Sequence, residues 1–238
     1  MSDLRRFFVP SVTSQTIIDG EEFYHAVNVL RIKIGDEVIL CDNTGDEYIA
    51  TIVSIAKKEL IANVTSKSSS DKETKNFVTL ICGYLKGDKT ELVVQKATEL
   101  GVKKIVVFSS KFSSAFMNEN KLLRLKRVAL ESAKQCGRAI VPQVEYAENI
   151  KKALEQGDSA KHKLFACEFA TSNEVEFNQL NDSTAIVVGS EGGFSEDEWQ
   201  TALDKGYKTV YLGKRILRAD TASIVLCGIV MHALKELE

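Results

Sequence analysis

The sequence predicts a small β-barrel followed by an α/β domain with a parallel sheet. Short strand-like segments separated by turn residues fill roughly the first seventy residues, which is typical of a small barrel. Residues 66–76 contain no apolar side chain and resemble a linker. Beyond them, strand patterns alternate with helix patterns, as they do in parallel sheets. We therefore place a barrel domain in residues 1–70 and an α/β domain in residues 76–238.

The composition is that of an ordinary globular protein. Of 238 residues, 44% are hydrophobic and 27% are charged, and the net charge is −2, so any basic surface has to be local. The five cysteines are scattered and form no CxxC pair, which favours free thiols in a reducing compartment over a zinc site. The three histidines form no recognisable metal or nucleophile set. We expect a cytoplasmic protein without a metal.

No segment predicts a membrane anchor. Arg5 and Arg6 near the start are not followed by a long apolar stretch, so a secretion signal is not expected. The longest nearly apolar run, residues 222–234, is too short to cross a bilayer and is typical of a buried helix. We expect no membrane partner.

Elements of the first domain follow from local patterns. Residues 37–41 form an apolar strand, and the next residues have turn chemistry, with Gly45 free to adopt a positive φ. Residues 48–55 are rich in β-branched side chains, and residues 60–64 alternate apolar and polar positions, as in a half-buried strand. Apolar side chains at helical spacing predict one short helix over residues 23–30.

The second domain contains strands and helices in alternation. Five apolar segments predict strands: 77–84, 104–108, 163–167, 185–188 and 209–212. Helices are predicted over 91–100, with Gly101 as its C-terminal stop, and over 118–136. Ser195 and Glu198 form a capping box that opens another helix.

The last predicted helix, from about Thr221, is apolar nearly all round. A surface helix has one polar face, so this helix is either buried within one chain or shared with a second chain.

Two loops that follow predicted strands are candidates for a ligand site. The first, residues 189–193, contains three glycines, through which a backbone can approach a ligand closely. Its spacing matches neither the dinucleotide nor the P-loop pattern. Glu191 would repel a phosphate and suits a positively charged ligand. A tight strand-to-helix turn without any ligand is the alternative.

The second loop, residues 212–222, ends a basic stretch. Residues 205–219 carry five basic side chains and no acid, and for most of the lysines a solvated surface is sufficient explanation. Arg218 lies between Leu217 and Ala219, so we expect a partly buried guanidinium that needs a partner. Asp220 would be a structural partner, and a phosphate or base edge would be a functional one.

Basic side chains also gather on the helix predicted over 118–136 and its exit. The span from residue 121 to residue 138 contains one acid, Glu131, and six basic side chains: Lys121, Arg124, Lys126, Arg127, Lys134 and Arg138. A merely soluble helix face is the alternative. Together with residues 205–218 and the sequence Arg-Arg-Phe-Phe at 5–8, they predict RNA binding.

These motifs resemble the RsmE family of ribosomal RNA methyltransferases, which belongs to the SPOUT class. The resemblance is carried by residues 189–195 and 212–222, and it extends to four further segments: 6–9, 25–31, 95–102 and 135–138. Two positions depart from the family pattern, because Ser190 replaces a proline and Asp220 replaces a glutamate.

The resemblance implies a fold and a reaction. The fold is a PUA-like RNA-binding barrel followed by a SPOUT domain with a C-terminal trefoil knot, an exception to the usual absence of knots. The chain would form a homodimer and bind S-adenosylmethionine. The implied reaction methylates N3 of a uridine in 16S ribosomal RNA of the small subunit. A SPOUT enzyme for another RNA nucleotide and a non-catalytic ribosome assembly factor are the rival interpretations.

The resemblance also implies roles for particular residues. Arg218 would hold the base or a phosphate and stabilise negative charge, although a permanently protonated arginine cannot act as a general base. Glu191 would lie near the cationic cofactor. The backbone expected around the cofactor belongs to Gly189, Gly192, Leu212, Gly213, Ile216 and Leu217. The residues expected to contact RNA are Arg5, Arg6, Arg31 and Arg138.

Overall fold

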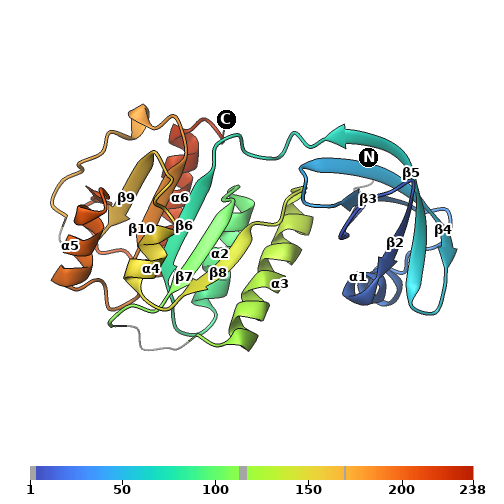
Figure 1. The fold of residues 1–238 in the computed structure, drawn as a ribbon, viewed down its shortest axis with the longest axis horizontal. Helices are drawn as coiled ribbons and strands as arrows, with labels where there is room; N and C mark the ends of the chain where they lie inside the picture. Colours follow the sequence, from blue (N-terminus) through green and yellow to red (C-terminus); the bar gives the residue numbers. More distant parts are fainter. Residues whose placement is uncertain (1–3, 113–116, 169, 238) are drawn as a thin grey trace. The chain divides into compact units, whose positions relative to one another are not determined.

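Two separate sheets organise the chain (Figure 1). The computed structural model describes residues 4–112, 117–168 and 170–237. Its contacts divide the chain into a first unit of residues 1–73 and 133–141 and a second unit of residues 74–132 and 142–238. The two units are described separately below.

The first unit is built on a curled five-stranded sheet. Its strands are β1 (Arg5–Phe8), β2 (Gln15–Asp19), β3 (Glu37–Cys41), β4 (Asp46–Ile55) and β5 (Glu59–Ser69). They lie in the order β1-β3-β4-β5-β2, with β1 parallel to β3 and the other pairs antiparallel. Alternate side chains such as Phe7, Leu40 and Ile52 are fully buried inside the curl. The sheet is the PUA-like half-barrel that the resemblance implies.

Two features of this unit refine the sequence prediction. The predicted helix is present as α1 (Gly20–Tyr24), which continues into a π-helix, η1 (His25–Val29). The prediction of a linker from residue 66 was wrong for its first four residues, because β5 extends to Ser69 and pairs with the start of β4. Side chains 66–69 are exposed, so backbone pairing can continue there without apolar residues.

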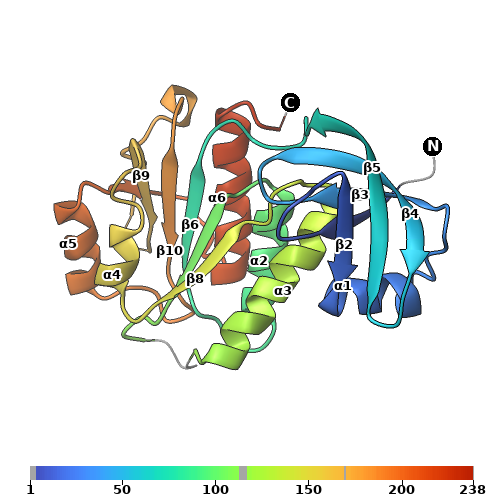
Figure 2. The same cartoon turned by 45° about the vertical axis from the view of Figure 1, so that its right-hand side comes forward.

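The second unit contains a six-stranded, fully parallel sheet. Its strands are β6 (Val78–Gly83), β7 (Lys104–Phe108), β8 (Gln143–Ala147), β9 (His162–Ala166), β10 (Thr184–Val188) and β11 (Lys208–Val210). They lie in the order β11-β9-β10-β6-β7-β8. Figure 2 labels four of them, β9, β10, β6 and β8, which follow one another from left to right. The strands β9, β10 and β11, which come last in the chain, are therefore neighbours at one end of the sheet.

Helices cover both faces of this sheet. They are α2 (Lys89–Glu99), α3 (Glu119–Cys136), α4 (Ile150–Glu155), α5 (Glu196–Asp204) and α6 (Ala219–Ala233). Helices α4 and α5 pack together on the face where Val106, Phe165 and Val187 are buried. Helix α6 packs on α2 and on strands β6 and β10. The sequence patterns did not predict β8 or α4, which are short elements.

The C-terminal segment does not stay at the edge where β11 lies. It returns to the middle of the sheet as α6, which also contacts the short helix η2 (Phe177–Gln179) of the β9–β10 connection. That connection is bound to β11, because the backbone N–H of Glu174 donates to Thr209 (3.1 Å) and its carboxylate accepts from Thr209 N–H (2.7 Å). These contacts bring segments that are distant in sequence to the carboxyl ends of β9, β10 and β11.

Neither a membrane span nor a metal cluster is found among the described residues. No helix in this part of the chain is long and apolar enough to cross a membrane. Within the same residues, no group of three or more His, Cys, Asp or Glu side chains is arranged to hold a metal ion.

Candidate functional site

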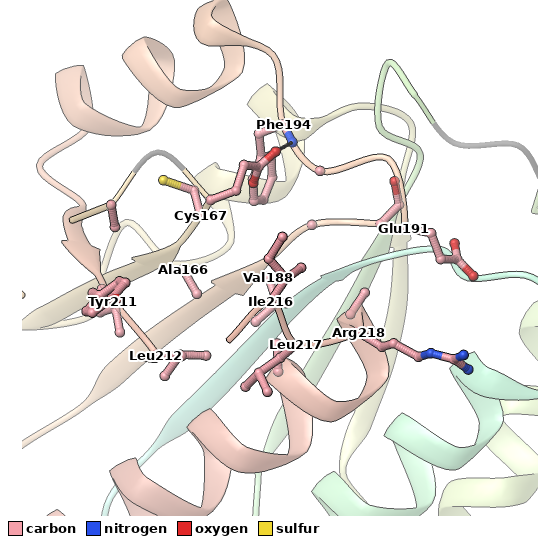
Figure 3. A pocket seen from close by; sticks show the side chains of 18 of the residues that line it. Ala166, Cys167, Val188, Glu191, Phe194, Tyr211, Leu212, Ile216, Leu217 and Arg218 are labelled. Carbon is pink, nitrogen blue, oxygen red and sulfur yellow. Dashed lines mark hydrogen bonds between the residues drawn. The ribbon is translucent and has the colours of Figure 1, made fainter. Parts of the chain in front are cut away.

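A pocket of about 710 Å³ lies at the carboxyl ends of β9, β10 and β11 (Figure 3). This is the edge of a parallel sheet where ligands usually bind, and the volume is within the range of ligand sites. The residues predicted at the two loops all line the pocket: Gly189, Glu191, Gly192, Leu212, Gly213, Ile216, Leu217 and Arg218. The fold therefore brings together the two segments that the sequence singled out.

The loop after β10 is a tight turn that depends on its glycines. Gly193 N–H donates to Ser190 C=O (3.0 Å), and Gly193 has a φ of +67°, which favours glycine. Gly83, the last residue of β6, lies directly against the Ser190 backbone, where a Cβ would overlap the Ser190 nitrogen. A side chain at Gly192 would meet Phe112. The backbone of this loop is therefore fixed by close contacts that exclude side chains.

Two anchors hold the end of the same loop. The Phe194 ring is buried and lies against Phe165, with ring centroids 4.3 Å apart. Ser195 then begins α5 with the predicted capping box, in which its hydroxyl accepts from Glu198 N–H and the Glu198 carboxylate accepts from Ser195 N–H. The Glu198 carboxylate also accepts from Lys111 N–H (3.1 Å), which joins the cap to the segment after β7.

Ser190, which departs from the family proline, has a specific partner. Its hydroxyl and that of Ser110 are buried and 2.7 Å apart. A proline would fix the loop through its ring, whereas here a hydrogen bond between buried side chains connects the loop to the segment after β7.

Two carboxylates line the pocket, and they have different surroundings. The Glu191 carboxylate accepts from Lys86 N–H (3.1 Å) and lies 3.2 Å from Lys89 Nζ. Partial burial acts to raise the pKa of Glu191, but the Lys86 N–H and the nearby ammonium outweigh it and lower the pKa below its usual value. Glu168, two residues after the end of β9, instead accepts from Phe194 N–H (3.1 Å).

The loop after β11 presents its backbone and apolar side chains to the pocket. Tyr211 N–H donates to Asn173, but the backbone N–H and C=O groups of residues 212–217 make no hydrogen bond to any described residue. Ile216 is 98% exposed. A ligand with an apolar ring and polar edges could satisfy both features.

Arg218 does not occupy the partly buried position that the sequence predicted. It is exposed at the N-cap of α6, where its backbone is extended and its C=O accepts from Ala222 N–H (2.8 Å). The prediction was wrong because the apolar neighbours Leu217 and Ala219 belong to a loop end rather than to a helix interior. Asp220 forms no ion pair with it in the described structure. The Arg218 guanidinium is therefore available to a ligand.

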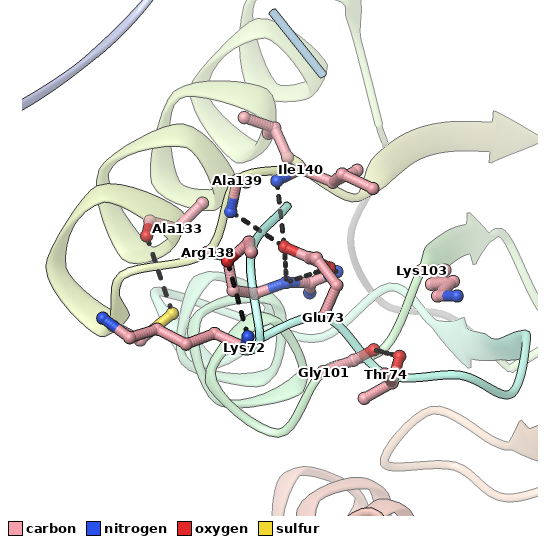
Figure 4. A network of polar contacts seen from close by, with 12 residues as sticks. Lys72, Glu73, Thr74, Gly101, Lys103, Ala133, Arg138, Ala139 and Ile140 are labelled. Atoms are coloured by element: carbon pink, nitrogen blue, oxygen red, sulfur yellow. Dashed lines mark hydrogen bonds and ion pairs between the residues drawn. The ribbon is translucent and has the colours of Figure 1, made fainter. Parts of the chain in front are cut away.

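The arginines predicted to contact RNA fall into two groups. Arg5 is exposed on β1, and Arg31 is exposed after η1 with a φ of +56°. Arg6 is buried and lies 3.1 Å from a Glu47 carboxylate oxygen. Arg138 is only 2% exposed and forms a 3.0 Å ion pair with Glu73 (Figure 4). Direct RNA contact by Arg6 or Arg138 stays a prediction that their burial does not favour.

The basic helix α3 is also partly neutralised. Arg124 forms an ion pair with Glu91 (2.9 Å), and Lys134 forms one with Glu22 (2.8 Å). The positive charge available to a phosphate backbone is therefore smaller than the sequence count indicated.

The sequence patterns missed Glu168, Lys89 and Ser110 at this site. Glu168 had a usable signal, because an acid directly follows a predicted strand, and the carboxyl ends of parallel strands meet at one edge. Lys89 and Ser110 had no such signal. They follow β6 and β7 in the chain, and only the order of the strands in the sheet brings them to the loop after β10.

Comparisons with known proteins agree with this geometry. Residues 72–231 match a family model described as an RNA methyltransferase domain, and residues 18–65 match one described as an RNA methyltransferase PUA domain. Ribosomal RNA small subunit methyltransferase E of Mesomycoplasma hyopneumoniae is 34% identical, covering 93% of this chain and 96% of the relative. The Bacillus subtilis protein of that name is 30% identical, covering 93% of each chain.

Solved structures show the same fold. A crystal structure of ribosomal RNA small subunit methyltransferase E from Neisseria gonorrhoeae, bound to S-adenosyl methionine, has a TM-score of 0.85 at 26% identity and covers 97% of this chain and 98% of that one. A Legionella pneumophila methyltransferase, solved with the same cofactor, has a TM-score of 0.88 at 23% identity, with the same coverage.

The parallel sheet, the returning helix α6 and the pocket at the strand ends define a methyltransferase domain of the trefoil-knotted SPOUT class. A PUA-like half-barrel precedes it. The identities over nearly the whole length narrow the assignment further: the chain belongs to the ribosomal RNA small subunit methyltransferase E family.

The residues at the pocket suit S-adenosylmethionine. Apolar side chains, including Val188, Leu212 and Leu217, line it together with the unpaired backbone groups of residues 212–217, as a purine ring with polar edges requires. Two carboxylates, those of Glu168 and Glu191, line it together with four basic side chains: Lys89, Lys214, Arg215 and Arg218. A carboxylate in this position can contact a cationic ligand. When bound, this cofactor supplies an electrophilic methyl group on a positively charged sulfur.

Proposed function

We propose that this protein methylates N3 of a uridine in 16S ribosomal RNA, with S-adenosylmethionine as the methyl donor, and that it acts on the small ribosomal subunit in the cytoplasm. One observation carries the proposal: both sequence motifs meet at one pocket, which is lined by apolar side chains, unpaired backbone groups and two carboxylates. Membership of the family, shown by the comparisons above, supports the same reaction.

We assign the cofactor to the two loops. The backbone of Gly189, Gly192 and residues 212–217 surrounds the adenine and methionine portions in this proposal. The rigid turn at 190–193 keeps that backbone in place before binding, which reduces the ordering that binding would otherwise require.

Arg218 is the proposed catalytic residue. Uracil N3 carries a proton at neutral pH and has to lose it, which leaves negative charge on the ring. A guanidinium stays protonated and donates hydrogen bonds in a fixed fork, so it can stabilise this charge and orient the base. The exposure of Arg218 at the pocket rim leaves its guanidinium free for that contact.

We propose that residues 1–70 form the RNA-binding domain and residues 76–238 the catalytic domain. In the first, Arg5 and Arg31 are the exposed candidates for phosphate contacts. Such contacts raise affinity with little regard to sequence and weaken with salt. We further propose a homodimer formed through the SPOUT domain.

The first experiment tests Arg218. In Arg218→Ala, we expect the methylation rate on small subunits to fall about 100-fold or more, as when one charge-stabilising donor is removed. The dissociation constant for S-adenosylmethionine, measured by calorimetry, should stay within about twofold, because the cofactor contacts assigned above are other groups. Lys151→Ala, at an exposed position on α4, is the control and should retain activity.

A second measurement tests the reaction itself. Ribosomal RNA from cells that lack this gene should contain one 3-methyluridine fewer by mass spectrometry. Adding the protein and S-adenosylmethionine to those small subunits should restore it. An unchanged set of modified nucleotides would contradict the proposed reaction, and restoration of a different methylated nucleotide would favour another RNA target.

A further inference from the structure

Only one of the two pocket carboxylates is neutralised within the described chain. Glu191 lies 3.2 Å from Lys89 Nζ and accepts from Lys86 N–H, so its charge already has partners. Glu168 has no lysine, arginine or histidine nitrogen of the described residues within 4.0 Å. Glu168 is therefore the pocket carboxylate that forms no ion pair with a described residue.

The Glu168 carboxylate is nevertheless held in place. Its Oε1 accepts from Phe194 N–H at 3.1 Å, and the Phe194 ring is fixed in the core against Phe165. Among the described residues, its second oxygen receives no hydrogen bond. One oxygen is thus anchored to the rigid end of the β10 loop, while the other is left for a ligand.

Gly193 provides the space for this arrangement. Its φ of +67° already favours glycine, and a Cβ there would overlap the Glu168 carboxylate. The third glycine of the loop therefore lets an acid from the end of β9 approach the loop that follows β10. In Figure 3 the dashed line at Phe194 marks the hydrogen bond that results.

We propose that Glu168 binds the positively charged methionine portion of the cofactor. This inference rests on the proposed function, and it assigns to Glu168 the role that was expected of Glu191 from the resemblance. Glu191 instead holds the β10 loop to the start of α2 through Lys86 and Lys89. A carboxylate without a cation of its own gains more from a cationic ligand than one that is already paired, because no existing contact has to be replaced.

Glu168→Gln tests the charge while keeping an oxygen that can accept from Phe194 N–H. Three ligands are titrated by calorimetry into wild type and variant: S-adenosylmethionine, S-adenosylhomocysteine and methylthioadenosine. The first carries a sulfonium and an ammonium, the second only the ammonium, and the third neither. We expect S-adenosylmethionine to bind about tenfold more weakly to the variant, the loss of one charge-assisted contact. Methylthioadenosine should bind both proteins alike.

The second ligand identifies the charge involved. If S-adenosylhomocysteine also weakens about tenfold, Glu168 binds the ammonium, and if it is unaffected, Glu168 binds the sulfonium; both results support the proposal. Equal weakening of all three ligands, or unchanged binding of S-adenosylmethionine, would overturn it. Glu176→Gln, an exposed acid of the same connection that does not line the pocket, is the matched control and should behave as wild type.

The failure of this inference is separable from the failure of the proposed function. Wild type that does not bind S-adenosylmethionine would contradict the function itself. Wild type that binds it, beside a Glu168→Gln variant with unchanged affinity, contradicts only the role of Glu168. Glu168→Ala removes the Phe194 contact as well, so a larger loss with alanine than with glutamine measures the structural part of the effect.

Discussion

Environment gives different roles to side chains of the same type in this pocket. The pKa of Glu191 is lowered because the Lys86 N–H and Lys89 favour its charged form more than partial burial opposes it. A carboxylate with a depressed pKa in the folded state contributes stability above its unfolded pKa, and it loses this contribution as pH falls through the folded value. The contacts of Glu191 with Lys86 N–H and Lys89, which connect the β10 loop to the start of α2, are therefore fully formed at neutral pH and are lost only in acid.

The cysteines also differ in their surroundings, and this difference predicts that they react with alkylating agents at different rates. Burial raises the pKa of Cys82 to about 12, whereas Cys167 is partly exposed and lines the pocket. Because the thiolate is the reactive form, iodoacetamide should alkylate Cys167 in the native protein far faster than Cys82. S-adenosylmethionine should slow the reaction at Cys167 by covering it. Peptide mass spectrometry over time measures both rates.

Cys136 is the internal control for this experiment. It is also partly exposed but does not line the pocket, so the cofactor should leave its alkylation rate unchanged. Equal protection of Cys136 and Cys167 would indicate a general tightening of the fold. No protection of Cys167 would contradict a cofactor site at the end of β9.

At the scale of elements, the start of α5 determines the position of the β10 loop. Its capping box satisfies backbone N–H groups that a helix start leaves without partners, and Glu198 extends the same network to Lys111. The helix is thus fixed to the loop on one side and to the segment after β7 on the other. Stability and cofactor affinity should therefore depend on the same cap.

Replacing Ser195 by alanine separates these two effects. Loss of an N-cap costs about 1 kcal/mol of unfolding free energy, and here it should also weaken S-adenosylmethionine binding because the loop loses one anchor. Asn149→Ala removes the cap of α4, whose side chain accepts from Lys152 N–H, and α4 does not line the pocket. It should destabilise equally, as measured by urea unfolding, and leave the calorimetric affinity unchanged. Equal affinities for both variants would contradict the anchoring role of α5.

At the scale of the whole molecule, local patterns predicted what local physics determines. The capping box at Ser195 and most strands of the parallel sheet have strong periodic or chemical signals, and the structure confirms them. Strand β8 and helix α4 are short and lack such signals. The order β11-β9-β10-β6 depends on contacts between distant segments, so only the resemblance to a family could indicate it.

The apolar pattern of helix α6 does not by itself determine which surface the helix packs against. The sequence allowed burial within one chain or sharing with a second chain. Leu226 and Val230 are fully buried against the chain's own sheet, whereas Val225 and Ile229 are 40% and 36% exposed. Leu92, on the neighbouring helix α2, is exposed to a similar extent. One face of α6 therefore belongs to the core, and the other is available to a second copy.

The exposed face gives the test of the homodimer. A lysine at Ile229 would place a charge in the proposed interface without disturbing the core, so Ile229→Lys should reduce the mass measured by light scattering from that of two chains to that of one. Its thermal unfolding should remain cooperative.

Ile17→Lys, at an exposed apolar site on β2 of the first unit, is the matched control and should keep the wild-type mass. A lysine at the buried Leu226 would instead test the fold. An Ile229→Lys variant with the mass of two chains would contradict a dimer through this face, because a desolvated lysine without a partner there would strongly oppose association.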